Sequence, residues 1–395
     1  MAQTDVLITE SGYENILIGL LKELGYEYTH GSEVPRSSPL YQDVYITEDF
    51  LTTVGRINAE LPRVAIETAL TQLQDLSGGS VVDLNMTFTT YIQDGVPVRY
   101  FVDDEEVYNR VQLLDYHNAK NNFFRVVNQY TFQERETKRP DVILFVNGMP
   151  LVLFELKSPT RDNTDTSEAY AQIQRYLKVI PSIFVPNAFC VLTDLADTRV
   201  GSITAPEDRF MVWKTKDGKT EDSGCGRIGT MIRGMCAKER LLDLVKNFIC
   251  FDSRQKGKAK IIAGYHQYYA VKKAIERALV AVGSNADVPE SQRKKIGVFW
   301  HTQGSGKSLS MVFFAHAIIE KLKTSTIVVI TDRNQLDDQL FGQFAACKEF
   351  LHQEPVQARN KRHLLELLNN RKVNGIIFTT MQKFGELKDT YEKFA

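Results

Sequence analysis

Apolar residues recur at helical spacing in several parts of the chain. Ser11 and Glu14 form a capping-box pattern, and the isoleucines and leucines that follow predict a first helix. The same spacing predicts further helices within 58–76, 166–177 and 241–248. The first half of the chain therefore contains amphipathic helices that need an apolar surface to pack against.

Runs rich in β-branched and aromatic residues lie between these helices. They occupy Asn122–Phe132, Asp141–Lys157 and Phe189–Thr193, and they predict strands. Frequent glycines and scattered charges between residues 200 and 233 instead predict an irregular crossing segment.

From Ile296 onward, the pattern becomes a regular alternation of strands and helices. Strands are predicted at Ile296–Trp300, Thr326–Thr331 and Ile376–Thr380, and a helix is predicted from Lys307. Such alternation is typical of a parallel sheet with helical crossovers. We therefore expect an α/β protein in which a mixed-sheet domain precedes a parallel-sheet domain.

The length supports two domains. The chain has 395 residues, which exceeds the roughly 250–300 residues at which single hydrophobic cores stop growing. We place the first domain and its linker at 1–230 and the second domain at 231–395.

Charge divides the chain unevenly. Residues 1–200 contain 16 Lys and Arg against 28 Asp and Glu, a net of −12, whereas residues 201–395 contain 32 against 21, a net of +11. The second half suits a polyanionic partner such as DNA. A nucleic-acid role for the first half has to be argued from a particular site.

Composition excludes several classes of protein. The apolar fraction of 43% is too high for wholesale disorder, and no apolar run reaches the roughly 18 residues of a membrane span. Residues 1–5 lack the basic-then-apolar plan of a signal peptide. The five cysteines form no C-x-x-C, which argues against zinc and suits reduced thiols. We expect a cytoplasmic protein.

The segment His301–Ser308, with sequence HTQGSGKS, lies between a predicted strand and an amphipathic helix. Small residues let consecutive backbone N–H groups turn toward an anion, and the helix N-terminus adds positive potential. In such a loop Lys307 reaches the β- and γ-phosphates of a nucleotide, and the Ser308 hydroxyl binds Mg²⁺. A glycine-rich turn without chemistry is the alternative, and the strand–loop–helix context argues against it.

Three motifs together, His301–Ser308, Thr331–Gln339 and Thr379–Phe384, resemble those of superfamily 2 motors, in the variant found in the R subunit of type I restriction enzymes. The resemblance implies a RecA-like lobe that binds ATP and Mg²⁺. It implies nucleotide contacts at Thr302, Gly304, Ser305, Gly306, Lys307 and Ser308. Upstream, Tyr265–Val271 resembles the adenine-side segment of that family, where Gln267 would read the base edge. The alternative for Gln267 is a surface amide.

Asn147-Gly148 between two apolar runs is one of the strongest hairpin signals. With a three-residue loop, Asp141 falls opposite Glu155, and Lys157 lies on the same face as Glu155. A loop of two or four residues shifts the parity, so that a bulge would be needed to restore this arrangement.

Two directly opposed carboxylates destabilise a sheet unless positive charge lies between them. A hard divalent cation, Mg²⁺ or Mn²⁺, meets that need, so Asp141 and Glu155 are the predicted metal ligands. Lys157 can then neutralise charge on a phosphate or position the attacking water. Glu14 and Glu67, on upstream helices, both remain open as a further ligand. A strand pair with exposed terminal charges is the alternative for the whole set.

Pro140-Asp141 followed by Glu155-Leu156-Lys157 resembles the PD-(D/E)xK motif of nucleases. On the next predicted helix, Gln172 and Tyr176 share a face, and the pair is similar to the Q-x-x-x-Y pair of restriction-subunit and RecB-type nucleases. The first domain is thereby expected to be restriction-endonuclease-like. The resemblance implies a catalytic set of Asp141, Glu155, Lys157, Gln172 and Tyr176.

The resemblance further implies the N-terminal portion of an R subunit of a bacterial or archaeal cytoplasm. Such subunits cut double-stranded DNA with Mg²⁺, translocate it with ATP, and act with modification (M) and specificity (S) subunits. The alternative is a superfamily 2 helicase or translocase with a non-cleaving N-terminal adaptor. A regulatory nucleotide-binding module would leave the +11 of the second half unexplained.

No apolar run followed by a Walker-B Asp-Glu pair appears after Ile376–Thr380, and Asp337-Asp338 lies in a predicted helical stretch. We therefore expect a chain truncated before that motif, which by itself does not hydrolyse ATP. The target DNA sequence, and how cleavage is restrained until translocation stalls, are not encoded in these motifs.

Overall fold

The computed structural model describes residues 10–157, 166–194, 197–222, 227–254, 258–282, 295–323, 326–369 and 375–385. The N-terminal residues 1–5, on which the argument about a signal peptide depends, lie outside this set, as does the side chain of Ser11. The chain divides into two compact units, Met1–Ile249 with Lys260–Ile262, and Cys250–Ala259 with Ala263–Ala395. The structure thus groups residues 231–249 with the first unit.

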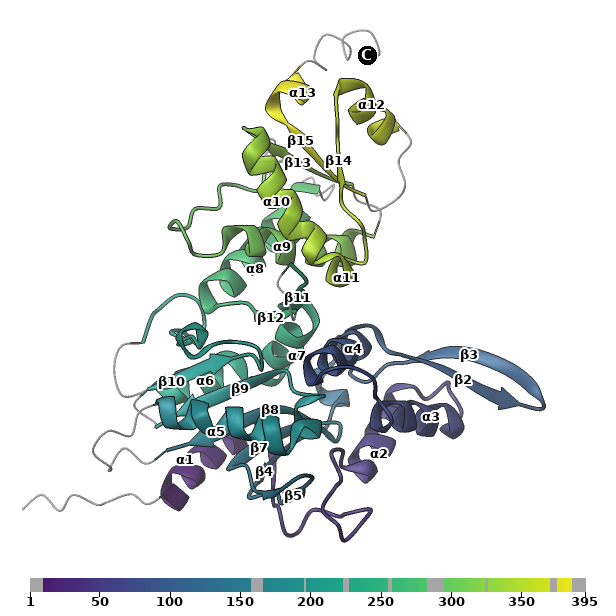
Figure 1. Ribbon diagram of the computed structural model, residues 1–395, viewed down its shortest axis with the longest axis vertical. Coiled ribbons are helices and arrows are strands. Elements are labelled where there is room, and N and C mark those ends of the chain that lie inside the picture. Colours follow the sequence, from purple (N-terminus) through teal and green to yellow (C-terminus); the bar gives the residue numbers. More distant parts are fainter. Residues whose placement is uncertain are drawn as a thin grey trace, which may run out of the picture. The chain divides into compact units, whose positions relative to one another are not determined.

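The first unit is built on a six-stranded mixed sheet with strand order β1-β4-β7-β8-β9-β10 (Figure 1). The pairs β1–β4 and β8–β9 are parallel, and the pairs β4–β7, β7–β8 and β9–β10 are antiparallel. The strands are β1 (Glu27–His30), β4 (Phe124–Asn128), β7 (Val142–Val146), β8 (Met149–Leu156), β9 (Phe189–Thr193) and β10 (Thr198–Gly201). The expected mixed-sheet architecture is confirmed.

Seven helices of the first unit are described around this sheet. They are α1 (Glu10–Glu23), α2 (Thr47–Ile57), α3 (Arg63–Gln74), α4 (Val81–Asp94), α5 (Thr166–Val179), α6 (Arg227–Met235) and α7 (Lys238–Asn247). Three short 3₁₀ turns are η1 (Ala119–Asn121), η2 (Pro181–Phe184) and η3 (Glu207–Arg209). The helix predicted over 58–76 begins only at Arg63, because Pro62 is extended at its N-cap. The segment predicted to be irregular contains α6.

The core beneath α5 explains why β7 and β8 are almost wholly apolar. Alternate residues of β7, Ile143 and Phe145, contact Leu153 of β8 and Ile173 of α5 in one buried cluster. Every residue of both strands is buried, so any charge at the end of this hairpin on the α5 face enters an apolar environment.

The turn of this hairpin is shorter than predicted. Val146 pairs with Met149, which leaves a two-residue loop, Asn147-Gly148, with φ of 50° and 74°. A bulge between Leu144 and Phe145 then shifts the register back, so that Val142 pairs with Phe154. The three-residue loop is therefore wrong, but the bulge restores the parity that the argument required.

Tertiary contacts fix this turn. Asn147 is fully buried, its Oδ1 accepts from Phe123 N at 2.7 Å, and its Nδ2 donates to Leu113 O at 2.8 Å. Gly148 O accepts from Ile46 N at 2.9 Å, and a Cβ at Gly148 would lie 2.3 Å from Ile46 O. The hairpin is thus tied to the start of α2.

A second hairpin, β2 (Val96–Val102) with β3 (Glu105–Val111), extends away from α2, α3 and α4 (Figure 1). Its turn is Asp103-Asp104, with φ of 50° and 65°. The short strands β5 (Phe132–Gln133) and β6 (Thr137–Lys138) form a further ribbon.

The first unit contains a buried lysine that hydrogen-bonds to two distant asparagines. Lys260 lies in β12 (Ala259–Ile262), is 4% exposed, and its Nζ donates to Asn85 Oδ1 at 2.9 Å and to Asn187 O at 2.5 Å. Burial lowers the pKa of Lys260 to about 7.

The second unit contains a parallel sheet of order β13-β15-β14. Its elements, with β11 at the boundary between units, are β11 (Ile249–Asp252), α8 (Tyr265–Val282), α9 (Lys307–Leu322), β13 (Ile327–Thr331), α10 (Asn334–Ala346), α11 (Lys348–Leu351), β14 (Val356–Gln357), α12 (Lys361–Asn369), β15 (Ile376–Thr380) and α13 (Met381–Gly385). The expected parallel α/β architecture is confirmed.

The strand predicted at Ile296–Trp300 is wrong. This segment has no regular structure, Gly297 has a φ of 118°, and Val298 and Trp300 are 94% and 80% exposed. The apolar pattern is that of a strand, but within the described part of the unit no neighbouring strand pairs with it. Among the described helices, none combines the length and hydropathy that crossing a bilayer requires.

Candidate active site

The β7–β8 hairpin brings the predicted acid pair together. Extending the register beyond the pair Val142–Phe154 places Asp141 opposite Glu155. Asp141 and Ile143 share one face of the sheet, as do Glu155 and Leu153, and this is the α5 face. Asp141 Oδ2 accepts from Leu156 N at 2.7 Å, so the carboxylate of Asp141 reaches across to β8.

Glu155 is a buried carboxylate under electrostatic strain. It is 2% exposed, its Oε1 lies 2.6 Å from Lys157 Nζ, and its Oε2 is buried with no hydrogen-bond partner among the described residues. Burial first, and then the negative charge of Asp141, raise the pKa of Glu155 to about 8, although Lys157 and the Tyr176 hydroxyl act in the opposite direction. Among the described residues, the charge of Lys157 therefore does not offset the burial of Glu155 and the nearby charge of Asp141.

The helix α5 places Gln172 and Tyr176 as predicted, on the face that packs over the hairpin. Tyr176 is 3% exposed. Burial raises the pKa of Tyr176, the charge of Glu155 raises it further, and a hydrogen bond with Gln172 lowers it. Both side chains therefore affect the electrostatics of the acid pair from the α5 side.

These residues fit a divalent cation. Two carboxylates share one face, and the buried oxygen Glu155 Oε2 has no hydrogen-bond partner in the described part of the chain. No third His, Cys, Asp or Glu joins them as a metal-binding cluster within the described ranges. A hard cation such as Mg²⁺ retains several waters and commonly takes only one or two protein carboxylates, so the pair alone is a sufficient protein contribution.

Of the two upstream acids left open by the sequence, only Glu14 is connected to this end of the sheet. Glu14 Oε1 accepts from Gln129 Nε2 at 2.7 Å, and Gln129 N donates to Asp141 O at 3.0 Å. Glu67 instead pairs with Arg63 on α3 at 2.7 Å and is 48% exposed. Sequence reasoning missed Gln129, which has a φ of 51° and lies just beyond β4.

In the second unit, the loop before α9 contains the features that the predicted phosphate loop requires. Gly304 and Gly306 have φ of 81° and 79°, and α9 begins at Lys307 with no side-chain cap at its N-terminus. Lys307 Nζ donates to His301 O at 2.9 Å and to Thr302 O at 2.8 Å. The cationic side chain therefore bonds carbonyls of its own loop.

The remaining predicted contacts surround the same loop. Ser305 Oγ donates to Thr302 O at 2.8 Å, Thr302 and Gly304 are exposed, and Ser308 is half-buried in the first turn of α9. Nucleotide contacts at these positions stay predictions.

Gln267 is not a surface amide. It is 6% exposed, its Oε1 accepts from Gly264 N at 2.9 Å, and its Nε2 donates to Gly306 O at 3.0 Å. The side chain connects the start of α8 to the loop 301–308, and a Cβ at Gly306 would lie 2.7 Å from Gln267 Nε2. Reading of a base edge by Gln267 stays a prediction.

Asp337 and Asp338 have structural partners. They lie in α10, where Asp337 accepts from Thr331 Oγ1 at 3.0 Å, and Gln357 Nε2 donates to both carboxylates at 2.7 and 2.8 Å. Their helical position agrees with their exclusion as a Walker-B pair.

Comparison with known proteins divides the chain in the same order. Residues 8–209 match the family described as type I restriction enzyme R protein N terminus, and residues 266–395 match that described as SWI2/SNF2 ATPase. The chain is 36% identical over 391 residues to the type I restriction enzyme HindI endonuclease subunit of Haemophilus influenzae, covering 96% of this chain and 36% of that protein.

Two further relatives are more distant. A protein of Methanocaldococcus jannaschii described as the MjaIXP endonuclease subunit is 32% identical, over 96% of this chain and 38% of its own length. The SauMSSORF170P endonuclease subunit of Staphylococcus aureus is 23% identical, over 96% and 37%. The chain therefore spans little more than a third of the length of these curated relatives.

Proposed function

The chain belongs to the type I restriction enzyme R protein N-terminus family, and on that premise we propose that its first unit cuts duplex DNA with Mg²⁺ while its second unit forms part of an ATP-driven translocase. The observation that carries the proposal is the juxtaposition of Asp141, Glu155 and Lys157 at the end of one apolar hairpin. Such charges in a buried place destabilise the fold unless they serve a ligand.

We propose that Asp141 and Glu155 hold the cation through their carboxylates. When bound, Mg²⁺ supplies a water of lowered pKa and neutralises charge on the phosphate. Asp141 is already oriented, since Leu156 N donates to its Oδ2. Tyr176, aided by Gln172, orients Glu155 from the α5 side.

Lys157 is proposed to stabilise the anionic phosphate during cleavage. Its Nζ lies 2.6 Å from Glu155 Oε1 and its side chain is 21% exposed, so it stands between the buried carboxylate and solvent. If the DNA backbone approaches from that side, a localised positive charge there favours a transition state with more negative charge than the substrate.

In the second unit, the proposed ATP site is the loop 301–308 with the N-terminus of α9. The chain's own contribution is a set of backbone N–H groups, the Lys307 ammonium and the Ser308 hydroxyl. Phosphate oxygens would replace the carbonyls of His301 and Thr302 as acceptors for Lys307. The partners proposed for the whole protein are double-stranded DNA and the modification and specificity subunits.

A double dissociation in the full-length protein tests the proposal. Asp141→Ala and Lys157→Ala should lower DNA cleavage by more than about a thousandfold while leaving ATP hydrolysis intact. Lys307→Ala should abolish ATP hydrolysis. Glu136→Ala, which removes a half-exposed carboxylate of the same unit, is the matched control and should change neither. Cleavage that survives Asp141→Ala would instead support a translocase with a non-cleaving adaptor.

A further inference from the structure

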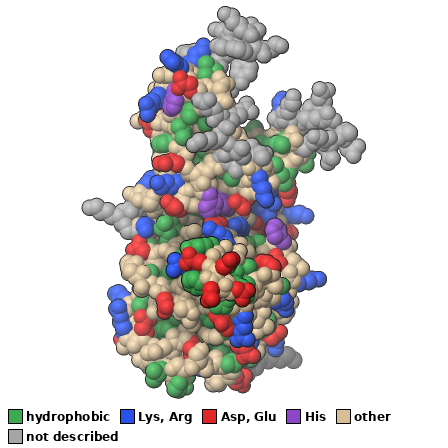
Figure 2. Space-filling model, turned by 90° about the vertical axis from the view of Figure 1, so that its right-hand side faces the viewer, with side chains coloured by type: hydrophobic (Ala, Val, Ile, Leu, Met, Phe, Trp, Pro, Cys, Tyr) green, Lys and Arg blue, Asp and Glu red, His purple; other side chains and the backbone are tan. Residues whose placement is uncertain are grey.

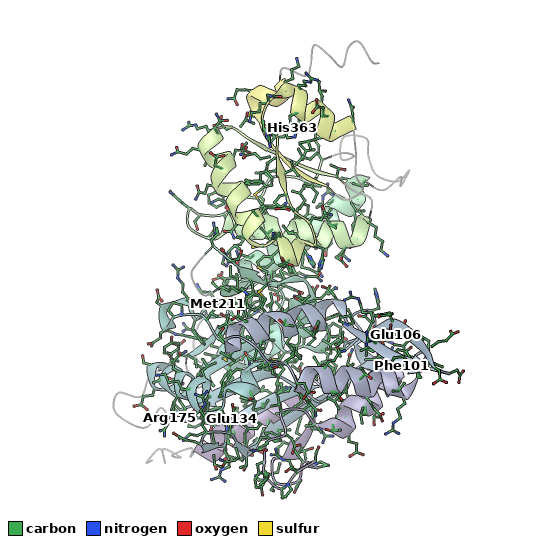
Figure 3. All side chains as sticks on the ribbon, turned by 45° about the vertical axis from the view of Figure 1, so that its right-hand side comes forward. Phe101, Glu106, Glu134, Arg175, Met211 and His363 are labelled. Atoms are coloured by element: carbon green, nitrogen blue, oxygen red, sulfur yellow. The ribbon has the colours of Figure 1, made fainter. Side chains whose placement is uncertain are left out.

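The β2–β3 hairpin exposes an aromatic surface that the proposed chemistry does not use. Phe101 and Tyr108 are 62% and 67% exposed. Strand pairing places them on one face, since Arg99 pairs with Tyr108 and Phe101 with Glu106. Figure 3 shows Phe101 and Glu106 at the outer end of the hairpin. Large aromatic side chains on a protruding ribbon are characteristic of binding surfaces rather than of solvated turns.

The opposite face of the hairpin is already covered. Val96, Val98 and Tyr100 are buried, and the base of β2 packs against α3. The burial pattern changes at Phe101, beyond which every residue of β2 is exposed. The base is therefore fixed to the first unit, whereas the outer half is a two-stranded ribbon of a kind that has little stability of its own in water.

Polar contacts hold the aromatic face in a defined arrangement. Glu106 Oε1 lies 2.8 Å from Arg99 Nε, and Glu106 Oε2 accepts from Tyr108 Oη at 2.9 Å. Because Arg99 and Glu106 neutralise one another, the centre of the face is apolar and aromatic with little net charge. A preorganised face of this kind loses less conformational entropy when a partner binds.

The tip beside that face is acidic. Asp103, Asp104 and Glu105 are consecutive and exposed, and they form no ion pair within the described part of the chain. In Figure 2 acidic and hydrophobic side chains gather together on the face turned toward the viewer. Three carboxylates repel a DNA backbone, and they attract a surface that carries Lys and Arg.

We propose that the outer half of the β2–β3 hairpin docks onto a protein partner with an apolar pocket flanked by basic residues. Phe101 and Tyr108 enter the pocket, and the carboxylates of the tip face the basic rim. Resting on the proposed function, we identify this partner with the modification–specificity assembly, so that the hairpin attaches the nuclease unit to the subunits that choose the DNA.

The test measures binding of the full-length protein to the purified modification–specificity assembly without DNA. Phe101→Ser with Tyr108→Ser should raise the dissociation constant by more than about tenfold, because exposed aromatic anchors dominate interface energetics. Asp103→Asn with Asp104→Asn keeps a residue type that tolerates positive φ, and it should weaken binding at low salt and flatten its salt dependence. Leu40→Ser, at a side chain that is 60% exposed elsewhere in the unit, is the matched control.

Three results would overturn the proposal: unchanged affinity of both hairpin variants, a loss confined to DNA retention by the assembled complex, or a change in the oligomeric state of the isolated protein. The second would make the hairpin a nucleic-acid contact, and the third would make the partner a second copy. Asp141→Ala distinguishes failure of the docking proposal from failure of the proposed nuclease. It should abolish DNA cleavage while leaving binding to the modification–specificity assembly intact. Equal melting temperatures of the hairpin variants and the wild type would show that each variant is folded.

Discussion

The acid pair of the first unit lies at the end of two strands that are each paired on both sides, whereas the loop 301–308 of the second unit follows a segment with no regular structure. Glu155 is 2% exposed, while Val298 and Trp300, a few residues before the loop, are 94% and 80% exposed. The carboxylates are held in position by the sheet. Lys307, by contrast, donates to carbonyls of its own loop, which the proposed nucleotide would have to replace.

This difference shows that the two candidate sites are held in position by different parts of the structure. The proposed nuclease site obtains its order from a tight hairpin and a buried core, at the cost of placing two carboxylates close together. The proposed nucleotide site has two glycines with positive φ and a helix N-terminus without a side-chain cap, so we expect its order to depend on a bound anion. Substitutions in the hairpin should therefore mainly change the stability of the first unit. The stability of the loop 301–308 should mainly depend on whether the proposed nucleotide is bound.

The largest effect on stability is expected from Gly148→Ala, which would strain the turn that sets the register of the β7–β8 hairpin. A Cβ there would lie 2.3 Å from Ile46 O, at a φ of 74°. We expect the free energy of unfolding of the first unit to fall by more than about 2 kcal/mol, measured by urea denaturation. Gly55→Ala, where an added Cβ meets nothing within 4 Å in the helix α2, should be stabilising by about 0.5–1 kcal/mol. Equal tolerance of both changes would contradict a register fixed by this turn.

A pH-dependent effect is expected from Glu155→Gln. The folded pKa of Glu155, about 8, lies above the ordinary value of 4.5, so the folded state binds more protons than the unfolded state between these pH values. Stability from this group is present below pH 4.5 and is lost as pH rises to about 8, by up to about 1.4 kcal/mol per pH unit. Glu155→Gln should remove that slope from the urea profile of the first unit.

A divalent cation should act in the opposite direction. At pH 8, Mn²⁺ should stabilise the wild-type first unit by pairing with the charged carboxylates and should do little for the Glu155→Gln variant. A pH profile unchanged by the substitution would show that the carboxylate of Glu155 is not forced into an apolar, negatively charged place.

The smallest effect on stability is expected from Lys307→Ala. The hydrogen bonds of Lys307 join it to a partly exposed loop, so its loss should change the free energy of unfolding by less than about 1 kcal/mol. Protection of the second unit by MgATP in thermal melts should nevertheless disappear. Lys321→Ala, on the exposed side of α9, should keep that protection. Protection that persists in Lys307→Ala would place the nucleotide elsewhere.

Local signals predicted the positions of the candidate site residues better than the pairing of strands. Asn147-Gly148 correctly predicted the hairpin, and period-2 alternation correctly predicted that Glu155 and Lys157 share one face of the strand. The bulge between Leu144 and Phe145 has no sequence signal, since both residues fit an ordinary apolar strand. Ile296–Trp300 failed for a related reason, because a strand exists only where another strand pairs with it, and a local pattern does not encode the partner.

The role of Gln267 was equally inaccessible to sequence reasoning. Its burial and its bond to Gly306 O depend on how α8 packs beside the loop. The connection of Glu14 to Asp141 through Gln129 depends on a residue with φ of 51° just beyond β4. Both features arise from tertiary contacts between distant parts of the chain.

Lys260 has a consequence for biosynthesis. The first unit ends at Ile249 and then takes back Lys260–Ile262 after a stretch assigned to the second unit. Until the ribosome has released that return strand, Asn85 Oδ1 and Asn187 O have no ammonium donor from it. During translation, the first unit therefore cannot be completed when Ile249 emerges, and its last contacts form only after Cys250–Ala259 and the return strand have followed.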